Sequence, residues 1–253
     1  MMMNDTEATP GKMLLNFGKM FTGSAGLWEG ARFLIAEVPL NRKEVKKILP
    51  LGLWPSDPAT GMFFIVDYVK TSFTFPYKEA ALLINVNTPL GRGVHCCWMV
   101  VDDDTALIYG RELLGYPKKF GKFTFQEEGN HVSASVSRRG VTVLSMEGEK
   151  GAPQNPPPAV FDRKTFNTGG PGSFFMFSPI WMFRPREVIK ESYSAQVTVK
   201  ISQTHFDPIW KLVDGDAFAG RFVVSDIPGT HYNIMVGAAG LVYSARTFYL
   251  RFR

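Results

Sequence analysis

The chain has 253 residues and a mild formal net charge of +5, from 28 Lys and Arg against 23 Asp and Glu. The charge is spread along the sequence, which argues against a nucleic-acid-binding protein, and no stretch reaches the roughly 18 consecutive apolar residues of a membrane-spanning helix. Hydrophobic residues at 45% are enough for a sizeable core, and an all-β domain often reaches this length as a single unit.

The N-terminal residues 1–12 carry acidic side chains and lack the apolar core of a secretory signal. We expect them to form a disordered tail, followed by a lead-in segment at 13–27 without sustained periodicity. The segment 150–158 contains four prolines and predicts a loop within one fold, because a domain that began there would have only about 95 residues and no clear helices. The sequence therefore predicts one domain over 13–253.

The first half of the chain is punctuated by turns and by one well-marked helix. Asn41 has the preferred residue type for a helix N-cap, Glu44 follows it at capping-box spacing, and Pro50 ends the helix. Runs rich in β-branched and aromatic residues predict strands on either side of this helix. These runs are 31–38, 62–70, 80–87 and 94–101.

The second half predicts more strands than helices. Three alternating runs separated by short turns predict an antiparallel meander, at 122–127, 131–137 and 141–147. Further strand-like runs lie at 194–201, 220–225, 230–236 and 239–252. The glycine-rich segment 169–172 predicts a turn or backbone crossing, and 207–212 predicts a short helix. Many short strands with few helices favour a mainly β, β-rich α+β fold with an antiparallel sheet that is closed or nearly closed.

Cysteine and histidine usage gives no metal motif. Cys96 and Cys97 are adjacent in an apolar run, without the spacing of a zinc site or of a disulfide framework. The four histidines are scattered, and His95 is of interest only because it precedes the cysteines. We predict no metal site and a cytoplasmic protein with reduced thiols.

The chemistry of the sequence is concentrated in the segment Gly110 to Gly121, which reads GRELLGYPKKFG. A lysine amine is a nucleophile only without its proton, and both an apolar pocket and a nearby second cation favour that form. Lys118 and Lys119 are flanked by Tyr116, Pro117 and Phe120, so both effects are available. A Lys-Lys pair without such flanks is usually a solvated surface pair.

This segment closely resembles the active-site segment of the acetoacetate decarboxylase family, which is itself the standard example of an amine activated by a second cation. The resemblance implies that Lys118 forms a Schiff base and that Lys119 activates it. It also implies a β-barrel or cone with a central cavity, a homo-oligomer, and no cofactor, because the imine is the electron sink. The resemblance covers roughly residues 25 to 125.

Two further residues match the family pattern. Arg32 resembles the arginine that faces the substrate carboxylate or the catalytic glutamate, and Glu79 resembles the catalytic glutamate. The alternative interpretation for each is a surface charge or a structural ion pair. Arg111 and Glu112 are interpreted as structural groups that fix the motif, and residues 112–114 are expected to form a short helical turn.

The substrate-binding prediction includes three aromatic residues. Tyr116 is expected to line the pocket, and Phe64 stands where the clostridial-type enzymes carry another glutamate, with Asp67 as the nearest acid. Trp98 belongs to a set of aromatic residues that favours a substrate larger or more apolar than acetoacetate, although most of that set is expected to be core.

These observations lead to one main hypothesis and two alternatives. The main hypothesis is a carboxy-lyase that decarboxylates a β-keto acid, acetoacetate or a larger analogue, through Lys118. The first alternative is a Schiff-base aldolase or dehydratase that acts on a 2-oxo acid such as pyruvate, because the lysine can persist while the outcome changes. The second is a small-molecule-binding barrel without catalysis. A keto acid is the expected partner, with neither nucleic acid nor membrane.

Overall fold

The structure is a computed structural model that describes residues 27–173 and 177–252. The predicted tail at 1–12 and all but the last residue of the lead-in segment lie outside the described residues. The strands are β1 (Trp28–Pro39), β2 (Trp54–Pro55), β3 (Thr60–Tyr68), β4 (Lys70–Thr71), β5 (Tyr77–Thr88), β6 (Gly91–Val101), β7 (Lys118–Phe120), β8 (Lys122–Glu128), β9 (His131–Arg138), β10 (Val141–Pro153), β11 (Thr165–Thr168), β12 (Phe177–Ile201) and β13 (Ala219–Gly240).

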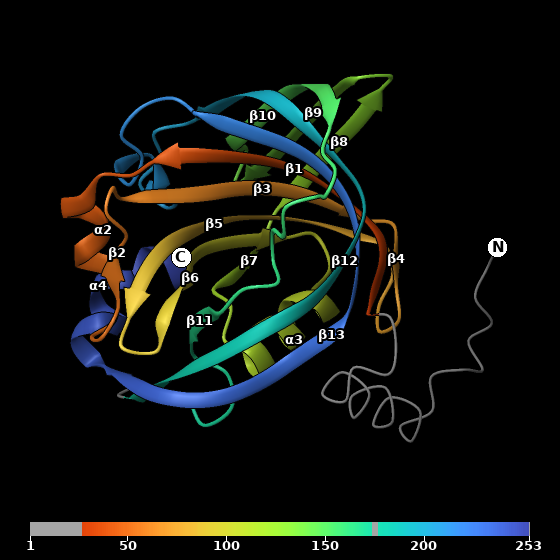
Figure 1. Cartoon of the computed structure of the whole chain (residues 1–253). Coiled ribbons are helices and arrows are strands. Elements are labelled where there is room, and N and C mark those ends of the chain that lie inside the picture. Colours follow the sequence, from red (N-terminus) through yellow and green to blue (C-terminus); the bar gives the residue numbers. More distant parts are fainter. Residues whose placement is uncertain (1–26, 174–176, 253) are drawn as a thin grey trace.

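All of these strands belong to one 13-stranded sheet that curves into a barrel-like wall (Figure 1). The order is β11-β6-β5-β3-β1-β13-β12-β10-β9-β8, and β11 also pairs with β12, so the path closes on itself. The mainly β prediction is confirmed. The sheet is mixed rather than purely antiparallel, because β6 pairs in parallel with both β7 and β11.

The central strands are apolar on both faces because each face packs against its own core. Along β3, Phe64 and Val66 face one cluster while Phe63 and Ile65 face the other. The first cluster lies inside the barrel. The second is covered by side chains from the predicted meander β8–β10 and from the short 3-10 helix η2 (Pro208–Lys211). Successive side chains of a strand point to opposite faces, so each position belongs to one core only.

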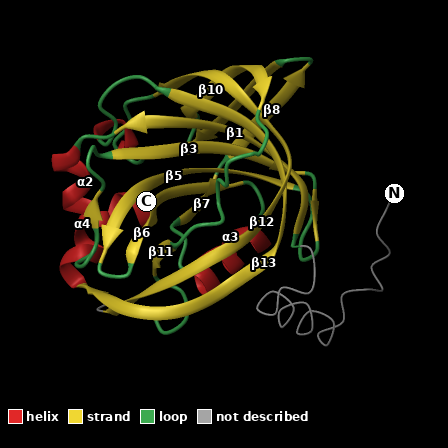
Figure 2. Cartoon of the chain, in the orientation of Figure 1, coloured by secondary structure: helices red, strands yellow, loops and turns green. Residues whose placement is uncertain are grey.

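Three α-helices accompany the described sheet, α2 (Arg42–Ile48), α3 (Asp104–Leu114) and α4 (Leu241–Arg251). Figure 2 shows α2 and α4 together at one end of the barrel, with α3 apart from them. The Asn41 side chain accepts hydrogen bonds from the backbone N–H groups of Lys43 and Glu44, which confirms the predicted N-cap.

The predicted strand at 239–252 is wrong over most of its length, because Leu241–Arg251 is helix α4. Its buried residues are Tyr243, Thr247, Leu250 and Arg251, which have the spacing of a helix face. Two of the four are polar, so an alternation of apolar residues did not reveal the helical period.

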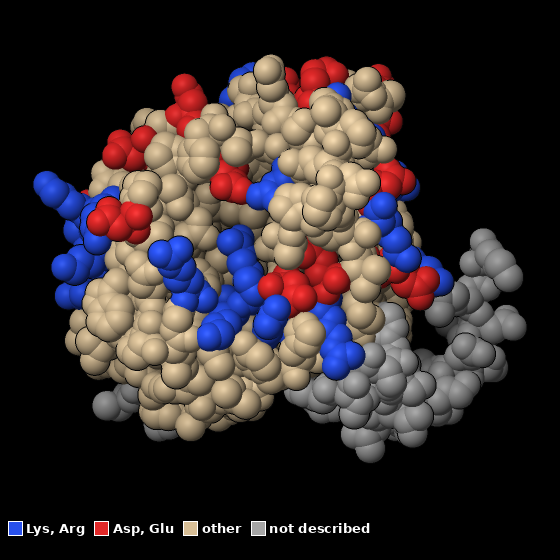
Figure 3. Space-filling model, in the orientation of Figure 1, with Lys and Arg blue, Asp and Glu red and all other residues tan. Residues whose placement is uncertain are grey.

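The charges on the surface are mixed in sign. On the face shown in Figure 3, Lys and Arg side chains lie beside Asp and Glu side chains around a hollow, rather than in a field of one sign. Within the described ranges, no helix is both long and apolar enough to span a membrane.

Candidate active site

An apolar cavity lies inside the barrel, against the inner faces of β1, β3, β5 and β6. Its volume open to the centres of water molecules is about 90 Å³. Aromatic and aliphatic side chains dominate its wall, including Phe33, Phe64, Tyr68, Leu83 and Met99. The charged residues on the wall are Glu79, Lys118 and Arg163. A small-molecule site is characteristically such an apolar hollow with a few polar groups.

Lys118 and Glu79 form a buried ion pair on this wall. The Lys118 Nζ lies 2.5 Å from the Glu79 Oε2, and both side chains are 6% exposed. Glu79 comes from β5 and Lys118 from β7, which is joined to β5 through β6. The same amine lies 5.7 Å from the centre of the Tyr77 ring and 5.9 Å from that of Tyr116. The contact to Glu79 is charge pairing rather than a well-oriented hydrogen bond, because Oε2 has no partner of hydrogen-bond geometry.

Helix α3 makes room for the Lys118 side chain. A Cβ added to Gly110 would lie 2.3 Å from the Lys118 Cε and 2.5 Å from its Cδ, so the lysine runs directly over this glycine. The sequence predicted only a short helical turn near 112–114. The helix is longer because Asp103 caps it, accepting a hydrogen bond from the Ala106 N–H at 2.7 Å. Its buried residues Ala106 and Gly110 are small and give little hydrophobic signal.

The turn after α3 directs the chain into β7. Gly115 has the left-handed φ of +70°, which favours glycine, and a Cβ there would lie 3.0 Å from the backbone of Gly169. Gly169 belongs to the glycine-rich segment, which is therefore a turn and a close backbone approach, as predicted. Arg111 completes the support because its Nη1 donates to the carbonyl oxygens of Lys118 and Arg251, each at 2.9 Å. Its role in fixing the motif is thus seen in its contacts.

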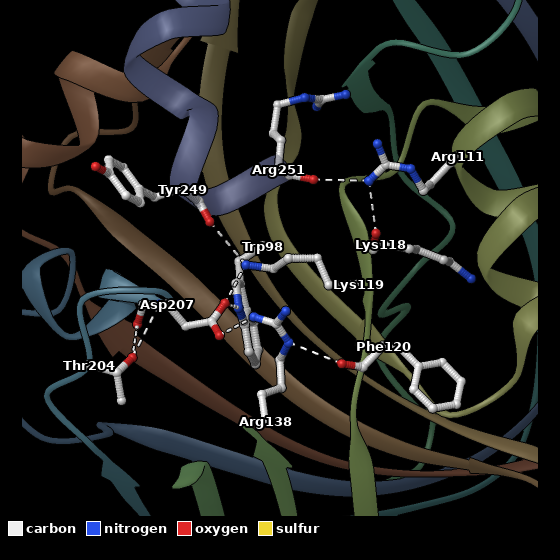
Figure 4. A network of polar contacts seen from close by, with 10 residues as sticks. All are labelled: Trp98, Arg111, Lys118, Lys119, Phe120, Arg138, Thr204, Asp207, Tyr249 and Arg251. Atoms are coloured by element: carbon white, nitrogen blue, oxygen red, sulfur yellow. Dashed lines mark hydrogen bonds and ion pairs between the residues drawn. The ribbon is translucent and has the colours of Figure 1, made fainter. Parts of the chain in front are cut away.

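Lys119 points to the opposite face of β7 and into the second core (Figure 4). Its amine pairs with the buried carboxylate of Asp207, which also pairs with Arg138 and accepts a hydrogen bond from the Trp98 Nε1 at 2.8 Å. Burial lowers the pKa of Lys119 to about 8, while Asp207 opposes this shift. Two cations therefore share one carboxylate in this cluster.

The structure brings four of the seven predicted site residues together and leaves three elsewhere. Lys118, Glu79, Tyr116 and Phe64 line the cavity. Lys119 does not line it, because adjacent residues of a strand face opposite sides. The expected activation of Lys118 by Lys119 stays a prediction.

Arg32 and Trp98 do not line the cavity either, so the prediction that they do is wrong. The Arg32 side chain is 43% exposed and lies 3.5 Å from Glu127 of β8, outside the cavity. Trp98 is completely buried in the second core against Asp207. Both side chains point away from the cavity, because on each strand the next residue, Phe33 or Met99, is the one that faces it.

The position of Asp67 also follows from the alternation of side chains along a strand. Asp67 pairs with Lys78 at 3.3 Å and lies on the opposite face of β3 from Phe64, so it does not supply an acid beside Phe64. Glu79 is therefore the acid on the described part of the cavity wall. Burial raises the pKa of Tyr116 well above its ordinary value, which keeps its hydroxyl protonated.

His95 is a buried residue that makes a structural hydrogen bond. Its Nδ1 lies 2.8 Å from the Phe166 carbonyl oxygen, and burial lowers its pKa to about 4, so it is neutral near pH 7. The described residues gather no cluster of three His, Cys, Asp or Glu side chains suited to a metal ion.

Arg163 is a charged cavity residue that the sequence analysis missed. Arg163 follows the proline-rich segment and reaches the cavity wall from the loop before β11. A single arginine in an irregular segment carries no periodic signal, so only the folded chain places it there.

The fold and the buried amine–carboxylate pair define a class of β-rich proteins with a lysine in an enclosed apolar cavity. The family model described as acetoacetate decarboxylase (ADC) matches residues 19–234, so the chain belongs to the acetoacetate decarboxylase family. No curated protein matches the chain.

Several solved structures share the fold at low sequence identity. Acetoacetate decarboxylase from Legionella pneumophila has a TM-score of 0.75 and 15% identity, with 85% of this chain and 88% of that chain covered. The enduracididine biosynthesis enzyme MppR complexed with pyruvate gives 0.68 and 14%, covering 81% and 88%. An acetoacetate decarboxylase-like enzyme from Sphingomonas wittichii RW1 gives 0.67 and 17%, covering 85% and 94%. The fold is therefore common to proteins that differ in name.

Proposed function

We propose that this protein is a Schiff-base-forming lyase that decarboxylates a β-keto acid through Lys118. The observation that carries the proposal is the Lys118 amine 2.5 Å from Glu79 inside an apolar cavity. Membership of the acetoacetate decarboxylase family supports an enzyme, and its neighbours in structure include an enzyme complexed with pyruvate. The reaction itself is proposed from the geometry.

The first step forms the imine. The Lys118 Nζ, without its proton, attacks the ketone carbon of the substrate, a C–N bond forms, and the carbonyl oxygen leaves as water after proton transfer. Glu79 is the carboxylate within reach to accept the amine proton and to return one to the departing oxygen. The product of this step is a protonated imine beside a carboxylate.

The second step breaks the C–C bond to the substrate carboxylate. Its electron pair moves through the imine to the nitrogen, CO2 departs, and an enamine remains. A proton from Glu79 or from solvent then adds to the enamine carbon, and water releases the ketone from Lys118. The apolar wall favours this step because it disfavours a buried carboxylate more than it disfavours neutral CO2.

The alternative reaction, aldol condensation or dehydration of a 2-oxo acid such as pyruvate, starts from the same imine. The structural similarity to MppR complexed with pyruvate keeps it as the second candidate. Phe64 bears on the choice because it makes the part of the wall on the neighbouring strand β3 apolar rather than acidic. A binding barrel without catalysis is the third candidate.

Borohydride reduction in the presence of acetoacetate, larger β-keto acids or pyruvate tests the proposal. We expect a stable adduct on Lys118, located by peptide mass, and CO2 release from the β-keto acids. Lys122→Ala, which removes an exposed lysine on β8, is the matched control and should keep the adduct. Adduct formation with pyruvate but no CO2 release selects the alternative reaction. If Lys118→Ala binds the keto acids as well as wild type and no adduct forms on the native chain, the binding barrel is correct.

A further inference from the structure

Arg163 is a cation at the end of the cavity farther from Glu79. It lines both the apolar cavity and a polar groove that also contains Asn85 and Arg92. Its guanidinium donates to the Asn85 Oδ1 at 3.2 Å and contacts the Met62 Sδ at 3.7 Å, whereas its buried Nε has no partner among the described residues. A buried N–H donor without a partner is costly unless a ligand or a water molecule accepts its hydrogen bond.

Two acids, Glu37 and Glu187, act electrostatically on Arg163 but form no ion pair with it, and the Glu187 Oε1 has no hydrogen-bond partner among the described residues. Glu37 pairs with Arg221, and the Glu187 Oε2 accepts hydrogen bonds from the backbone N–H groups of residues 160–162. No carboxylate of the described residues lies within 4.0 Å of the Arg163 guanidinium. Glu79 and Lys118 balance each other, so Arg163 is the charged side chain without an ion-pair partner among the described residues that line the cavity.

The register of the sheet gives the separation between the two polar ends. Asn85 follows Glu79 by six residues on β5, and at about 3.3 Å per residue their Cα atoms are roughly 20 Å apart. Met62, the other contact of Arg163, pairs with Leu83, which is roughly 13 Å from Glu79 on the same basis. Allowing for the reach of the side chains, about 10–15 Å remains for a ligand to span.

The width of the cavity restricts what can span it. Spread over roughly 15 Å, a volume of about 90 Å³ leaves only about 6 Å² of cross-section for atom centres. That cross-section accommodates one unbranched chain of methylene groups. Because an extended zigzag chain advances by about 1.25 Å per C–C bond, roughly eight to twelve bonds are needed to connect the two ends.

We propose that Arg163 binds a carboxylate at the far end of an extended, unbranched keto acid whose carbonyl lies at Lys118. The substrate class is therefore a long-chain β-keto acid with a second, terminal carboxylate. The polar groove behind Arg163 keeps this end partly hydrated, which limits the cost of placing a carboxylate there. The inference rests on the proposed function for the reacting end, but the binding of the distal carboxylate is independent of the chemistry.

A matched pair of substrates tests this role. One is a β-keto acid of about twelve carbons, and the other carries a carboxylate in place of its terminal methyl group. For wild type we expect the KM of the dicarboxylate to be lower by roughly tenfold to a hundredfold, the value of one charge-assisted contact. Arg163→Met should abolish this preference, so that the KM values of the two substrates become similar. Arg163→Lys should restore part of it.

The control is Arg92→Met, which removes an exposed arginine of the same groove that does not line the cavity. It should leave the preference intact. Equal loss with both substrates in Arg163→Met, or the same loss in Arg92→Met, overturns the proposal. Thermal unfolding of each variant shows whether any loss comes from misfolding, and Arg163→Gln replaces Arg163→Met if the latter does not fold.

A non-reactive ligand separates this inference from the proposed function. Binding of saturated monocarboxylates and dicarboxylates of the same length, measured by calorimetry, requires no Schiff base. If no keto acid is turned over but the dicarboxylate preference still depends on Arg163, the proposed reaction is wrong and the binding role stands. If turnover occurs and neither ligand series depends on Arg163, the reaction stands and the role of Arg163 is wrong.

Discussion

Gly110→Ala is the sharpest test of how α3 positions the nucleophile. In an ordinary helix interior the change from glycine to alanine stabilises the protein by about 1 kcal/mol. Here the new methyl group would lie 2.3 Å from the Lys118 Cε and 2.9 Å from its Nζ. Carbon atoms pack at about 3.5–4.0 Å, so the lysine must move by more than about 1 Å.

The expected magnitudes differ for stability and activity. Overpacking costs about 1–3 kcal/mol, which the helix propensity of alanine partly offsets, so the free energy of unfolding should fall by no more than about 2 kcal/mol. A displacement of about 1 Å at the reacting amine costs about a hundredfold in rate. The variant should therefore fold and lose at least that factor in imine formation.

The assay is the rate of borohydride-trapped adduct on Lys118 together with urea unfolding. Glu112→Ala is the matched control, because Glu112 is exposed on the same helix and should leave both quantities near wild type. If Gly110→Ala forms the adduct at the wild-type rate, the amine does not react from the position seen in the structure. If both variants lose the same activity, the loss belongs to the helix in general.

Three further predictions concern the two ion-pair clusters. Glu79→Gln should keep a trappable adduct at Lys118 but lower turnover by about a hundredfold or more, because proton transfer loses its carboxylate; unchanged turnover argues against that role. Asp207→Asn should lower the free energy of unfolding in urea by about 3–5 kcal/mol by leaving Lys119 and Arg138 buried without their carboxylate, whereas Glu29→Gln in an exposed pair should cost no more than about 1 kcal/mol. The pKa of Lys119 is about 8 in the folded chain and 10.5 as its ordinary value, so the unfolded chain keeps a proton that the folded chain has lost between those pH values. The contribution of Lys119 to stability should therefore be complete above about pH 10.5 and be lost as the pH falls through 8, and a Lys119→Met variant that keeps the same pH slope contradicts this assignment.

The mainly β fold was predictable because its signals are local. The Asn41 cap and the meander residues at 131–137 and 141–147 show their structure within a few residues of sequence. The helices α3 and α4 were not recognised, since their buried positions include small or polar residues such as Gly110 and Arg251. The buried residues of these helices repeat with the helical period, but several of them are not hydrophobic, so the sequence pattern does not show the period.

The candidate site divides in the same way. The sequence by itself identified the segment from Gly110 to Gly121, its family and the cavity residues Lys118 and Glu79, because residue types in a specific order carry that information. Only the tertiary structure decided that Lys119 turns away from the cavity. The physical reason is the alternation of side chains across a strand, which separates adjacent residues into two cores according to a register that no local pattern shows.

The positions of Arg32 and Arg163 also depended on the tertiary structure. Arg32 has the residue type expected of a carboxylate-binding group. Its side chain nevertheless points to the face of β1 that is turned away from the cavity, beside Glu127. Arg163 lies in an irregular segment and is brought to the cavity by the path of the chain before β11. The sequence determined which ionisable side chains this protein has, and the pairing of distant strands decided which of them share the cavity.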